Sequence, residues 1–191
     1  MRMANDEARW VAQASAGDAA AFRHLVDAHA SALFRVCARI TRDNALAEDA
    51  VQEALFNAYR HLREFDGRAA FSTWLHRIAV NAALGEMRKR NRIEAALPED
   101  DEAADVLASS LEGPPGPERQ AVSAAVGRDI ETQLKRMSAI ERTAFVLRHH
   151  EGQSIEEISE TLSLSESASK QAIFRAVRKL RGALEPDGVE A

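Results

Sequence analysis

Residues 71–81 read Phe-Ser-Thr-Trp-Leu-His-Arg-Ile-Ala-Val-Asn, and Arg88, Lys89, Arg90 and Arg92 follow them. The apolar residues recur at helical spacing, so this stretch predicts an aromatic loop that leads into an amphipathic helix ending in four positive charges. One face of such a helix can pack inside a helical domain. The other face presents rings, an amide and cations, which suit a single nucleic-acid strand because bases stack on rings and phosphates attract Arg and Lys.

The same helical spacing continues on the N-terminal side of this stretch. Helices are predicted over residues 5–16, 19–41, 44–64 and 71–91. Short polar segments separate them, at residues 17–18, 42–44 and 66–68. The hydroxyl of Ser72 or Thr73 is expected to cap the fourth helix, since such side chains accept a hydrogen bond from a free backbone N–H at a helix start.

The C-terminal part of the chain has helix signals of its own. Helices are predicted over residues 117–137 and 165–184, and residues 138–141 and 154–157 have the Ser-x-x-Glu spacing of a capping box. The sequence contains no strand-length alternation and no internal repeat. The expected fold class is therefore all-α.

An acidic segment lies between these two parts. Residues 98–117 concentrate Asp, Glu, Pro and Gly, which give a packed core nothing to bury, so they are interpreted as a flexible linker. A solvated tether is the plainer interpretation, and the alternative is that the segment imitates nucleic acid in a basic channel. We expect two small helical domains joined by this flexible acidic linker. The predicted boundaries are 1–94 for the first domain, 95–119 for the linker, 120–184 for the second domain and 185–191 for a tail.

Residues 154–180 have the pattern of a helix-turn-helix. The residues spaced to face inward are Ile155, Ile158 and Leu162 in the first helix, and Ala168, Ala172, Ile173, Val177 and Leu180 in the second. In such a motif the second helix enters the major groove with its N-terminal residues first. The side chains that then face outward or forward, and are predicted to read base edges, are Ser165, Glu166, Ser167, Ser169, Lys170 and Gln171. Phosphates are assigned to Arg175, Arg178, Lys179 and Arg181. A helical hairpin within any α-bundle gives a similar pattern, so that interpretation stays open here.

The formal charge of −5 is unusual for a protein that binds DNA. Residues 1–97 hold 14 basic and 12 acidic side chains, residues 98–127 hold 1 and 7, and residues 128–191 hold 10 and 11. Neither predicted domain has the positive excess that sustains tight, independent DNA binding by counterion release. Either DNA is not the partner, or another molecule supplies most of the affinity for DNA.

Composition limits the remaining classes of function. With 191 residues, 46% of them apolar and 29% charged, the chain is typical of a soluble globular protein. No window reaches the roughly 18 apolar residues of a membrane span, and the N-terminus lacks the apolar core of a signal peptide, so we expect no membrane insertion and a cytoplasmic location. Cys37 is the only cysteine and lies in an apolar pattern, which predicts a buried, unreactive thiol.

An enzyme is disfavoured. The 6 histidines are scattered, and His149 and His150 are adjacent, so on a helix they point about 100° apart. The sequence contains no Gly-rich phosphate loop, nucleophile elbow or His-Glu-x-x-His pattern. No catalytic residue, metal site or cofactor is predicted.

Two further stretches carry a family resemblance. Residues 49–60 read DAVQEALFNAYR, and residues 151–158 read EGQSIEEI. With residues 71–81 they resemble the bacterial RNA polymerase sigma factors of the sigma-70 family, and the pattern is similar to the compact extracytoplasmic-function (ECF) group. The likeness covers both predicted domains in the family's order. It implies an N-terminal four-helix domain of the sigma region 2 type and a C-terminal helix-turn-helix domain of the region 4 type.

The resemblance implies that core RNA polymerase is a partner. In the family, region 2 binds a coiled coil of the polymerase's largest subunit, and the matching positions here are Asp49, Gln52, Glu53, Asn57 and Tyr59. At i, i+3 and i+4 spacing, the first three share one helix face, as docking on a partner helix requires. A solvated acidic face is the alternative interpretation.

The resemblance also implies that the first domain opens the minus-ten promoter element and captures an unstacked base. The loop would span residues 65–73, and Asn81 occupies the place of an asparagine that contacts the extruded base. Extruding a base costs a few kcal/mol, which stacking and hydrogen bonds to the base edge can offset. The predicted minus-ten contacts are Phe65, Arg68, Phe71, Ser72, Thr73, Arg77, Asn81, Arg88, Lys89 and Arg90, with Arg92 as a further phosphate contact. Trp74 and Ile78 are expected in the core, and Phe71 fits either role.

Region 4 is implied to read the minus-thirty-five element with residues 165–179. The predicted contacts are Ser165, Glu166, Ser167, Ser169, Lys170, Gln171, Arg175, Arg178 and Lys179. Many relatives carry an arginine where this chain has Ala172, and its loss removes a guanine contact worth about 1–3 kcal/mol. Base readout is therefore expected to rest on Glu166, Ser169 and Gln171. Glu166 can accept a hydrogen bond from a cytosine amine or repel backbone phosphate.

The expected function is that of a dissociable initiation subunit that binds core RNA polymerase and promoter DNA. An anti-sigma protein is a further partner that the resemblance suggests. The alternative is a stand-alone helix-turn-helix regulator that binds duplex DNA without polymerase. That alternative leaves the motif at residues 71–81 without a purpose.

Overall fold

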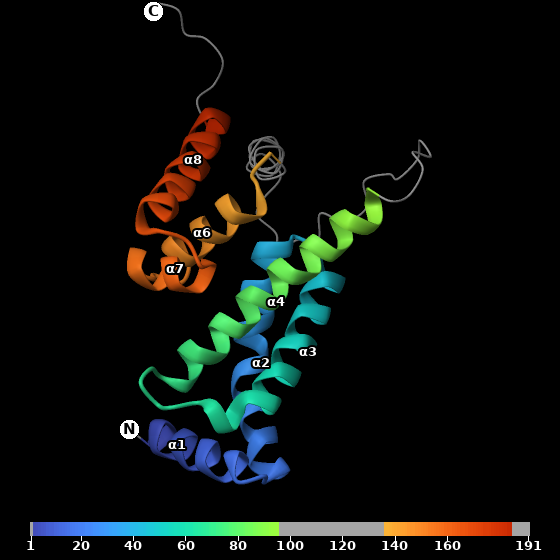
Figure 1. The fold of residues 1–191 in the computed structure, drawn as a ribbon, viewed down its shortest axis with the longest axis vertical. Coiled ribbons are helices and arrows are strands. Elements are labelled where there is room, and N and C mark those ends of the chain that lie inside the picture. The colour runs from blue at the N-terminus through green and yellow to red at the C-terminus, as the bar shows by residue number, and fades with distance from the viewer. Residues whose placement is uncertain (1, 96–135, 185–191) are drawn as a thin grey trace, which may run out of the picture. The chain divides into compact units, whose positions relative to one another are not determined.

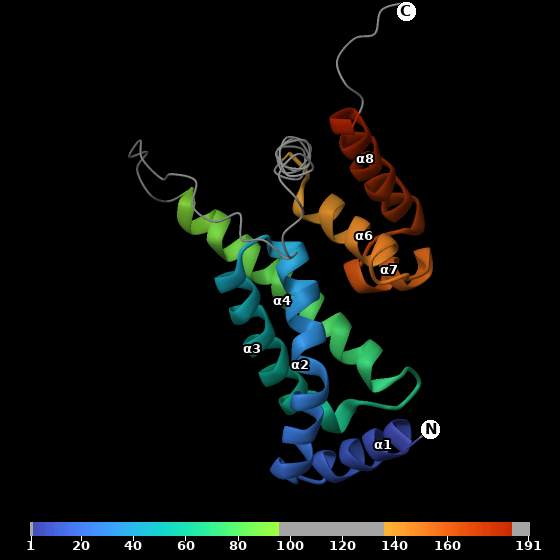
Figure 2. The same cartoon turned by 180° about the vertical axis from the view of Figure 1, so that it is seen from behind.

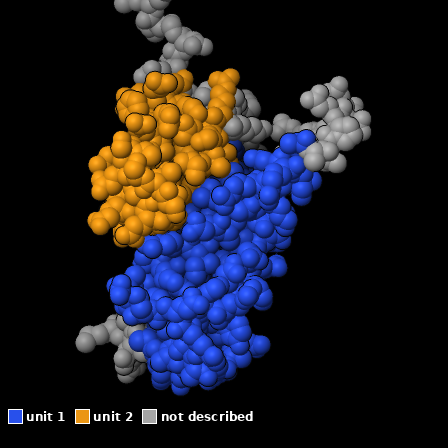
Figure 3. Space-filling model, in the orientation of Figure 1, with its two compact units in different colours: residues 1–97 blue, residues 98–191 orange. Residues whose placement is uncertain are grey.

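The computed structural model describes residues 2–95 and 136–184, and every regular element within these ranges is a helix. The chain divides into two compact units, Met1–Leu97 and Pro98–Ala191, which Figure 3 colours separately. The all-α prediction is confirmed for the described residues. The tail, the linker beyond residue 95 and nearly all of the helix expected over residues 117–137 lie outside them.

Unit 1 is a helical bundle. Its elements are α1 (Arg2–Ser15), α2 (Ala19–Thr41), α3 (Asn44–His61), a short 3-10 helix η1 (Leu62–Glu64) and α4 (Phe71–Glu94). Helices α2, α3 and α4 lie side by side in Figures 1 and 2, while α1 packs on α2 and η1. All four predicted helices of this part are present, and the one expected over residues 44–64 ends in the 3-10 turn.

The core of unit 1 is built around a ridge of small side chains on α3. Ala47, Ala50, Ala54 and Ala58 are fully buried there, which lets α2 and α4 approach closely. Larger residues of those helices, among them Leu33, Ile40 and Leu75, are buried in the same core. Cys37 is buried among them, and burial raises the pKa of its thiol to about 12, so the side chain stays neutral as predicted.

Carboxylates begin two of these helices, and an aromatic residue begins a third. Asp18 caps α2 and Asp43 caps α3, each accepting two backbone N–H bonds. The prediction for α4 is wrong, because its N-cap is Ala70, without a side-chain bond, and Ser72 and Thr73 lie inside the first turn. Packing explains the difference, since the first helical residue, Phe71, is buried against neighbouring rings and fixes the start of the helix.

Unit 2 contains α6 (Ala139–His149), α7 (Ile155–Leu162) and α8 (Glu166–Leu184), which pack on one another. Both predicted capping boxes are present, at the starts of α6 and α7. The turn between α7 and α8 passes through Ser163 in the left-handed conformation, with φ 53°, which ends α7 sharply. Helix α8 follows at once, so the two helices form the predicted helix-turn-helix.

Candidate functional site

The outer face of α3 carries the polar residues predicted to dock a partner. Asp49, Gln52 and Glu53 are exposed there, opposite the buried alanine ridge. Asn57 donates its side-chain amide to Glu53 Oε1 at 2.8 Å. Tyr59 lies at the edge of this face, 47% exposed, with its ring 5.0 Å from that of Phe22 on α2. The face is acidic at its N-terminal end and partly ordered by its own hydrogen bonds.

Phe56 lies at the centre of this face and is absent from the predicted site residues. It follows Asp49 by seven residues, or about two helical turns, and is 56% exposed. The Arg60 guanidinium lies 5.5 Å from the centroid of its ring. A large exposed ring surrounded by polar side chains is typical of an interface anchor. Its spacing of i+4 from Gln52 and i+3 from Glu53 is the signal that could have found it.

Four rings pack together at the start of α4. The centroid of the Phe71 ring lies 5.8 Å from Phe65, 5.7 Å from Trp74 and 5.6 Å from His29 of α2. Phe71 is only 4% exposed, so its ring is a core side chain and is not open to a DNA base in this structure. Of its two possible roles, the geometry supports the core. Trp74 joins the same cluster and is half-buried.

The loop before α4 presents a polar tip. Gly67 has φ 72°, a left-handed conformation that glycine adopts without strain. Arg68 folds back on Asp66, with 3.0 Å between Nε and Oδ2, and its backbone N–H donates to Oδ1. Both side chains are well exposed, so this ion pair can open to offer the guanidinium to a phosphate. Ser72 is also exposed, whereas Thr73 and Phe65 are half-buried.

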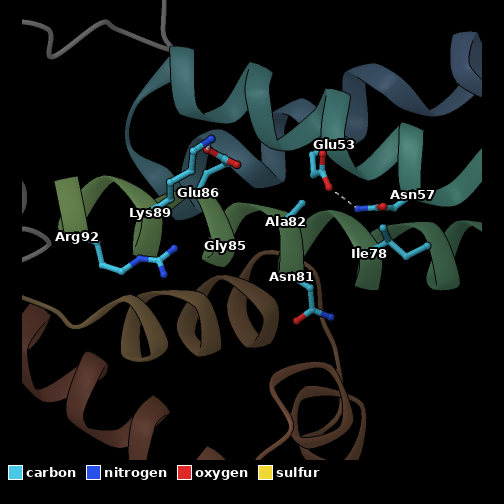
Figure 4. A pocket seen from close by; sticks show the side chains of 9 residues that line it. All are labelled: Glu53, Asn57, Ile78, Asn81, Ala82, Gly85, Glu86, Lys89 and Arg92. Atoms are coloured by element: carbon cyan, nitrogen blue, oxygen red, sulfur yellow. Dashed lines mark hydrogen bonds and ion pairs between the residues drawn. The ribbon is translucent and has the colours of Figure 1, made fainter.

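A groove of about 470 Å³ runs between α3 and α4. Its lining is drawn in Figure 4 and comprises Glu53, Asn57, Ile78, Asn81, Ala82, Gly85, Glu86, Lys89 and Arg92. Asn81 is exposed, and in Figure 4 its amide points away from α3. An exposed amide offers two donors and an acceptor, which suit the edge of an unpaired base. Ile78 is half-buried beside it.

The cations at the end of α4 fall into two groups. Arg88, Lys89 and Arg92 are exposed, with Lys89 Nζ 3.5 Å from Glu86 Oε2. Arg90 instead donates from Nη1 to Asp43 Oδ2 at 2.9 Å, while Oδ1 of the same carboxylate caps α3. Arg90 therefore ties α4 to the start of α3, and this geometry does not support its predicted phosphate contact. Arg77 is half-buried on the same helix.

Most of the predicted base-reading residues lie on the outward face of α8 or at its start. Those exposed are Ser165, Glu166, Ser167, Lys170 and Gln171. Lys170 Nζ donates to Glu166 Oε2 at 3.0 Å, one turn earlier. Phe174 continues this face and is 65% exposed, although no prediction named it. Its spacing of i+4 from Lys170 and i+3 from Gln171 is the signal that could have found it, because Phe can contact the thymine methyl group in the major groove.

Ser169 faces inward, contrary to the prediction. It is 0% exposed, and its Oγ is hydrogen-bonded to Ser159 Oγ of α7 at 2.9 Å. The reason lies in its register, because Ser169, Ala172 and Ala176 occur at i, i+3 and i+7 and form the buried stripe of α8. Ser169 is therefore a polar bridge inside the domain and cannot read a base in this structure.

Glu141 is a buried carboxylate that joins α6 to α8. It accepts from Ser138 N at 3.0 Å in the capping box, and from Lys179 Nζ at 2.6 Å, while Arg175 Nε lies 3.4 Å from its other oxygen. Burial raises the pKa of Glu141, but the Lys179 and Ser138 hydrogen bonds and the charges of Lys179 and Arg175 outweigh it, so its pKa lies below the ordinary 4.5. The predicted phosphate contacts Arg175 and Lys179 thus have a partner within the domain.

No helix formed by residues 2–95 or 136–184 has the length and apolar character that a membrane crossing needs. In these same ranges, no three His, Cys, Asp or Glu side chains gather as metal ligands would.

Comparison with known proteins gives consistent matches. Residues 25–93 match the sequence model of Sigma-70 region 2, and residues 127–180 match that of Sigma-70, region 4. The chain is 32% identical to the RNA polymerase sigma-H factor of Pseudomonas aeruginosa, over 89% of each chain. It is also 32% identical to the ECF RNA polymerase sigma-E factor of Haemophilus influenzae, over 89% of this chain and 90% of that protein. The sigma factor RpoE of Bartonella quintana, solved with the anti-sigma factor NepR, shares the fold with a TM-score of 0.61 at 23% identity, over 87% of this chain and 98% of that one.

Proposed function

The chain belongs to the ECF group of RNA polymerase sigma factors in the sigma-70 family, and we propose that it binds core polymerase and directs initiation at promoters through three surfaces described below. The observation that carries this function is that both sigma regions occur in family order on one chain that aligns with sigma factors over 89% of its length. Sigma factors act by binding, so the proposed mechanism needs no covalent step and no cofactor.

The first surface is the docking face of α3. Its acidic and amide side chains surround Phe56, so a partner helix can bury the ring while its own polar residues meet Asp49, Gln52 and Glu53. We assign this face, with Asn57 and Tyr59 at its edges, to the coiled coil of the polymerase's largest subunit. A solvated acidic face has no need of a half-exposed phenylalanine, which favours docking.

The second surface comprises the loop before α4 and the exposed side of that helix. Asn81 offers its amide to an unstacked base of the minus-ten element. Arg68, in the loop before α4, and Ser72, in the first turn of that helix, are exposed and belong to the same surface. Arg88, Lys89 and Arg92 follow Asn81 along α4 and can hold the phosphates of the same strand. Phe71 and Arg90 contribute indirectly, because they fix the start of α4 and its packing on α3.

The third surface is the outward face of α8, which enters the major groove of the minus-thirty-five element. Glu166, Lys170 and Gln171 supply polar groups for base edges, and Phe174 supplies an apolar contact for thymine. Arg178 is exposed for phosphate. Ser169 is buried and is not assigned a base contact, whereas Phe174 is exposed and is assigned one.

A stand-alone regulator is the less favoured function. It requires only unit 2 and leaves the docking face and Asn81 without a role. The match to Sigma-70 region 2 over residues 25–93 has no counterpart in that alternative. A mobility-shift experiment without polymerase separates the two, since the regulator predicts tight and selective duplex binding by the chain alone.

A run-off assay with purified core RNA polymerase tests the proposed function. Core enzyme plus this chain should yield promoter-specific transcripts from a library of genomic fragments, whereas core enzyme alone and the chain alone should not. The absence of any specific transcript, despite co-purification with core enzyme as a check of binding, would defeat the proposal.

Two further properties follow from the same assignment. We infer a cytoplasmic location, because core RNA polymerase and promoter DNA lie in the cytoplasm of a bacterium. The likeness of fold to a sigma factor solved with an anti-sigma factor supports a regulatory protein of that kind as a third partner.

A further inference from the structure

The five cations of α8 are not equally available to DNA. Lys170 is paired with Glu166 on the same helix, and Arg175 and Lys179 both face Glu141 of α6. Arg178 and Arg181 are exposed, and among the described residues no carboxylate lies within ion-pair distance of either. The helix that is to enter the major groove therefore has carboxylate partners for three of its five positive charges.

Glu141 differs from Glu166 because it is buried. It is 7% exposed and uses both oxygens, one for Ser138 N and Lys179 Nζ and the other for Arg175 Nε. A buried carboxylate must be paired, so its grip on these cations is stronger than that of an exposed ion pair. Lys179 is held at a second point too, since its Nζ donates to Arg136 O at 2.9 Å.

We propose that Glu141 is a specificity-determining residue, which acts as an internal counter-ion of α8 and limits the binding of unit 2 to DNA of any sequence in the absence of polymerase. The inference rests on the proposed function, because it takes α8 as the DNA-binding helix. Glu141 does not touch DNA in this account. It acts through Arg175 and Lys179, by keeping both from phosphate.

Counterion release gives the inference a physical measure. Each phosphate that a protein neutralises on duplex DNA steepens the fall of log K with log salt by about 0.9. Non-specific affinity comes almost wholly from this effect, whereas base readout does not. Holding two cations on a buried carboxylate lowers the affinity for random DNA more than the affinity for a promoter. The ratio of promoter affinity to random-DNA affinity therefore rises.

The substitution Glu141→Gln in the whole 191-residue chain tests the proposed counter-ion role. Glutamine also suits the third position of a capping box, so Ser138 keeps its partner while the charge disappears. We expect a short random-sequence duplex to bind the variant about fivefold to tenfold more tightly at 50 mM salt, with a salt slope steeper by about 1 to 2. Fluorescence anisotropy over a salt titration measures both. An unchanged slope in a folded variant overturns the inference.

Glu156→Gln is the matched control. Glu156 is an exposed carboxylate in the first turn of α7, and its substitution changes the net charge equally. We expect its salt slope to stay near that of the unchanged protein. A slope as steep as that of Glu141→Gln would show that net charge alone is responsible and would also overturn the inference.

A second pair of variants does not depend on the folding of Glu141→Gln. Arg178→Gln should lower the salt slope by about 0.9, because Arg178 is available to phosphate. Arg175→Gln should lower it by much less, because Glu141 already neutralises that charge. Equal losses contradict the inference. Run-off transcription with the unchanged protein is measured in parallel: a normal transcript with equal losses rejects this inference alone, whereas the absence of any transcript rejects the proposed function.

Discussion

Each unit of this protein exposes one phenylalanine on a helix face that is mostly polar. Phe56 on α3 is 56% exposed, and Phe174 on α8 is 65% exposed. Their neighbours one turn away differ in charge, since Gln52, Glu53, Tyr59 and Arg60 surround the first, while Lys170, Gln171, Val177 and Arg178 surround the second. The same apolar ring thus lies among side chains of both charges in unit 1, where Glu53 and Arg60 offset each other, and in a cationic face in unit 2.

The difference teaches how the two rings are assigned to two kinds of partner. Asp49 and Glu53 repel phosphate and offset the charge of Arg60, so the face around Phe56 suits a protein helix, and its ring can be fully desolvated there. The face around Phe174 attracts phosphate, as the proposed contact of its ring with the major groove requires. In the proposed assignment, charge selects the class of partner, and the ring adds apolar contact once the partner has docked.

Phe56→Ala should have the largest effect. An aromatic anchor at the centre of an interface commonly contributes 2 kcal/mol or more, so core polymerase should bind the variant about 30-fold more weakly. Fold and thermal stability should hardly change, because the ring is mostly exposed. Titration of labelled core enzyme measures the loss. Phe174→Ala is the matched control, and an equal loss of core affinity in both variants would remove the distinction between the two faces.

Asn81→Ala should slow promoter opening by about tenfold while core affinity stays intact. In the proposed assignment, the variant loses two hydrogen bonds to an extruded base, each worth about 0.5–1.5 kcal/mol. The fluorescence of 2-aminopurine at the opened position reports the step. Asn91→Ala, at another exposed asparagine of α4, serves as the control and should open the promoter normally. Slower opening in both variants, or weaker core binding by Asn81→Ala, contradicts the assignment.

Phe174→Ala should weaken promoter binding by about fivefold through loss of a contact with a thymine methyl group, which corresponds to about 1 kcal/mol. Replacing the thymines of the minus-thirty-five element with uracil removes the same methyl groups. The unchanged protein should therefore lose affinity on uracil-containing DNA, and the variant should not. If the variant is equally sensitive to uracil, its ring contacts something other than thymine.

The sequence was sufficient for the elements of the fold because their signals are local. Helical periodicity, carboxylate and serine caps, and the helix-turn-helix spacing predict where each described α-helix begins to within a few residues. The start of α4 is the exception, since Ser72 and Thr73 have the right chemistry for a cap but the burial of Phe71 decides the register. Tertiary packing outweighs local capping there.

The candidate site was less predictable, because residue type does not reveal which partner a side chain has. Arg90 resembles its neighbours in sequence, yet it meets Asp43, 47 residues away in the chain. Ser169 has the chemistry of a base reader, but the helix register turns it toward Ser159. Phe174 was overlooked for the opposite reason, since apolar residues on an amphipathic helix are expected to face the core. These long-range contacts are set by packing, which local patterns do not contain.

The smallest expected effect is that of Glu141→Gln on thermal stability, and it should be confined to unit 2. The lowered pKa of Glu141 means that its ion pairs stabilise unit 2 above the ordinary value of 4.5, and that this contribution is lost as the pH falls through the folded-state pKa. The gap between the unchanged protein and Glu141→Gln in thermal midpoint should be a few degrees at neutral pH, because about 1 kcal/mol shifts a domain of this size by roughly 4–8 °C. This difference in thermal midpoint should disappear at a pH below the folded-state pKa of Glu141.

Two spectroscopic probes show in which unit the thermal midpoint changes. Trp10 and Trp74, the 2 tryptophans of the chain, both lie in unit 1, so tryptophan fluorescence follows unit 1 alone, whereas circular dichroism follows the helices of both. The transition seen by fluorescence should be the same in both proteins at every pH, and only the circular dichroism should differ. A gap that persists at low pH would mean that the glutamine perturbs packing instead of charge. A shift in the fluorescence transition would mean that the buried carboxylate also stabilises unit 1. The charge of Glu141 would then be coupled to the unfolding of both units.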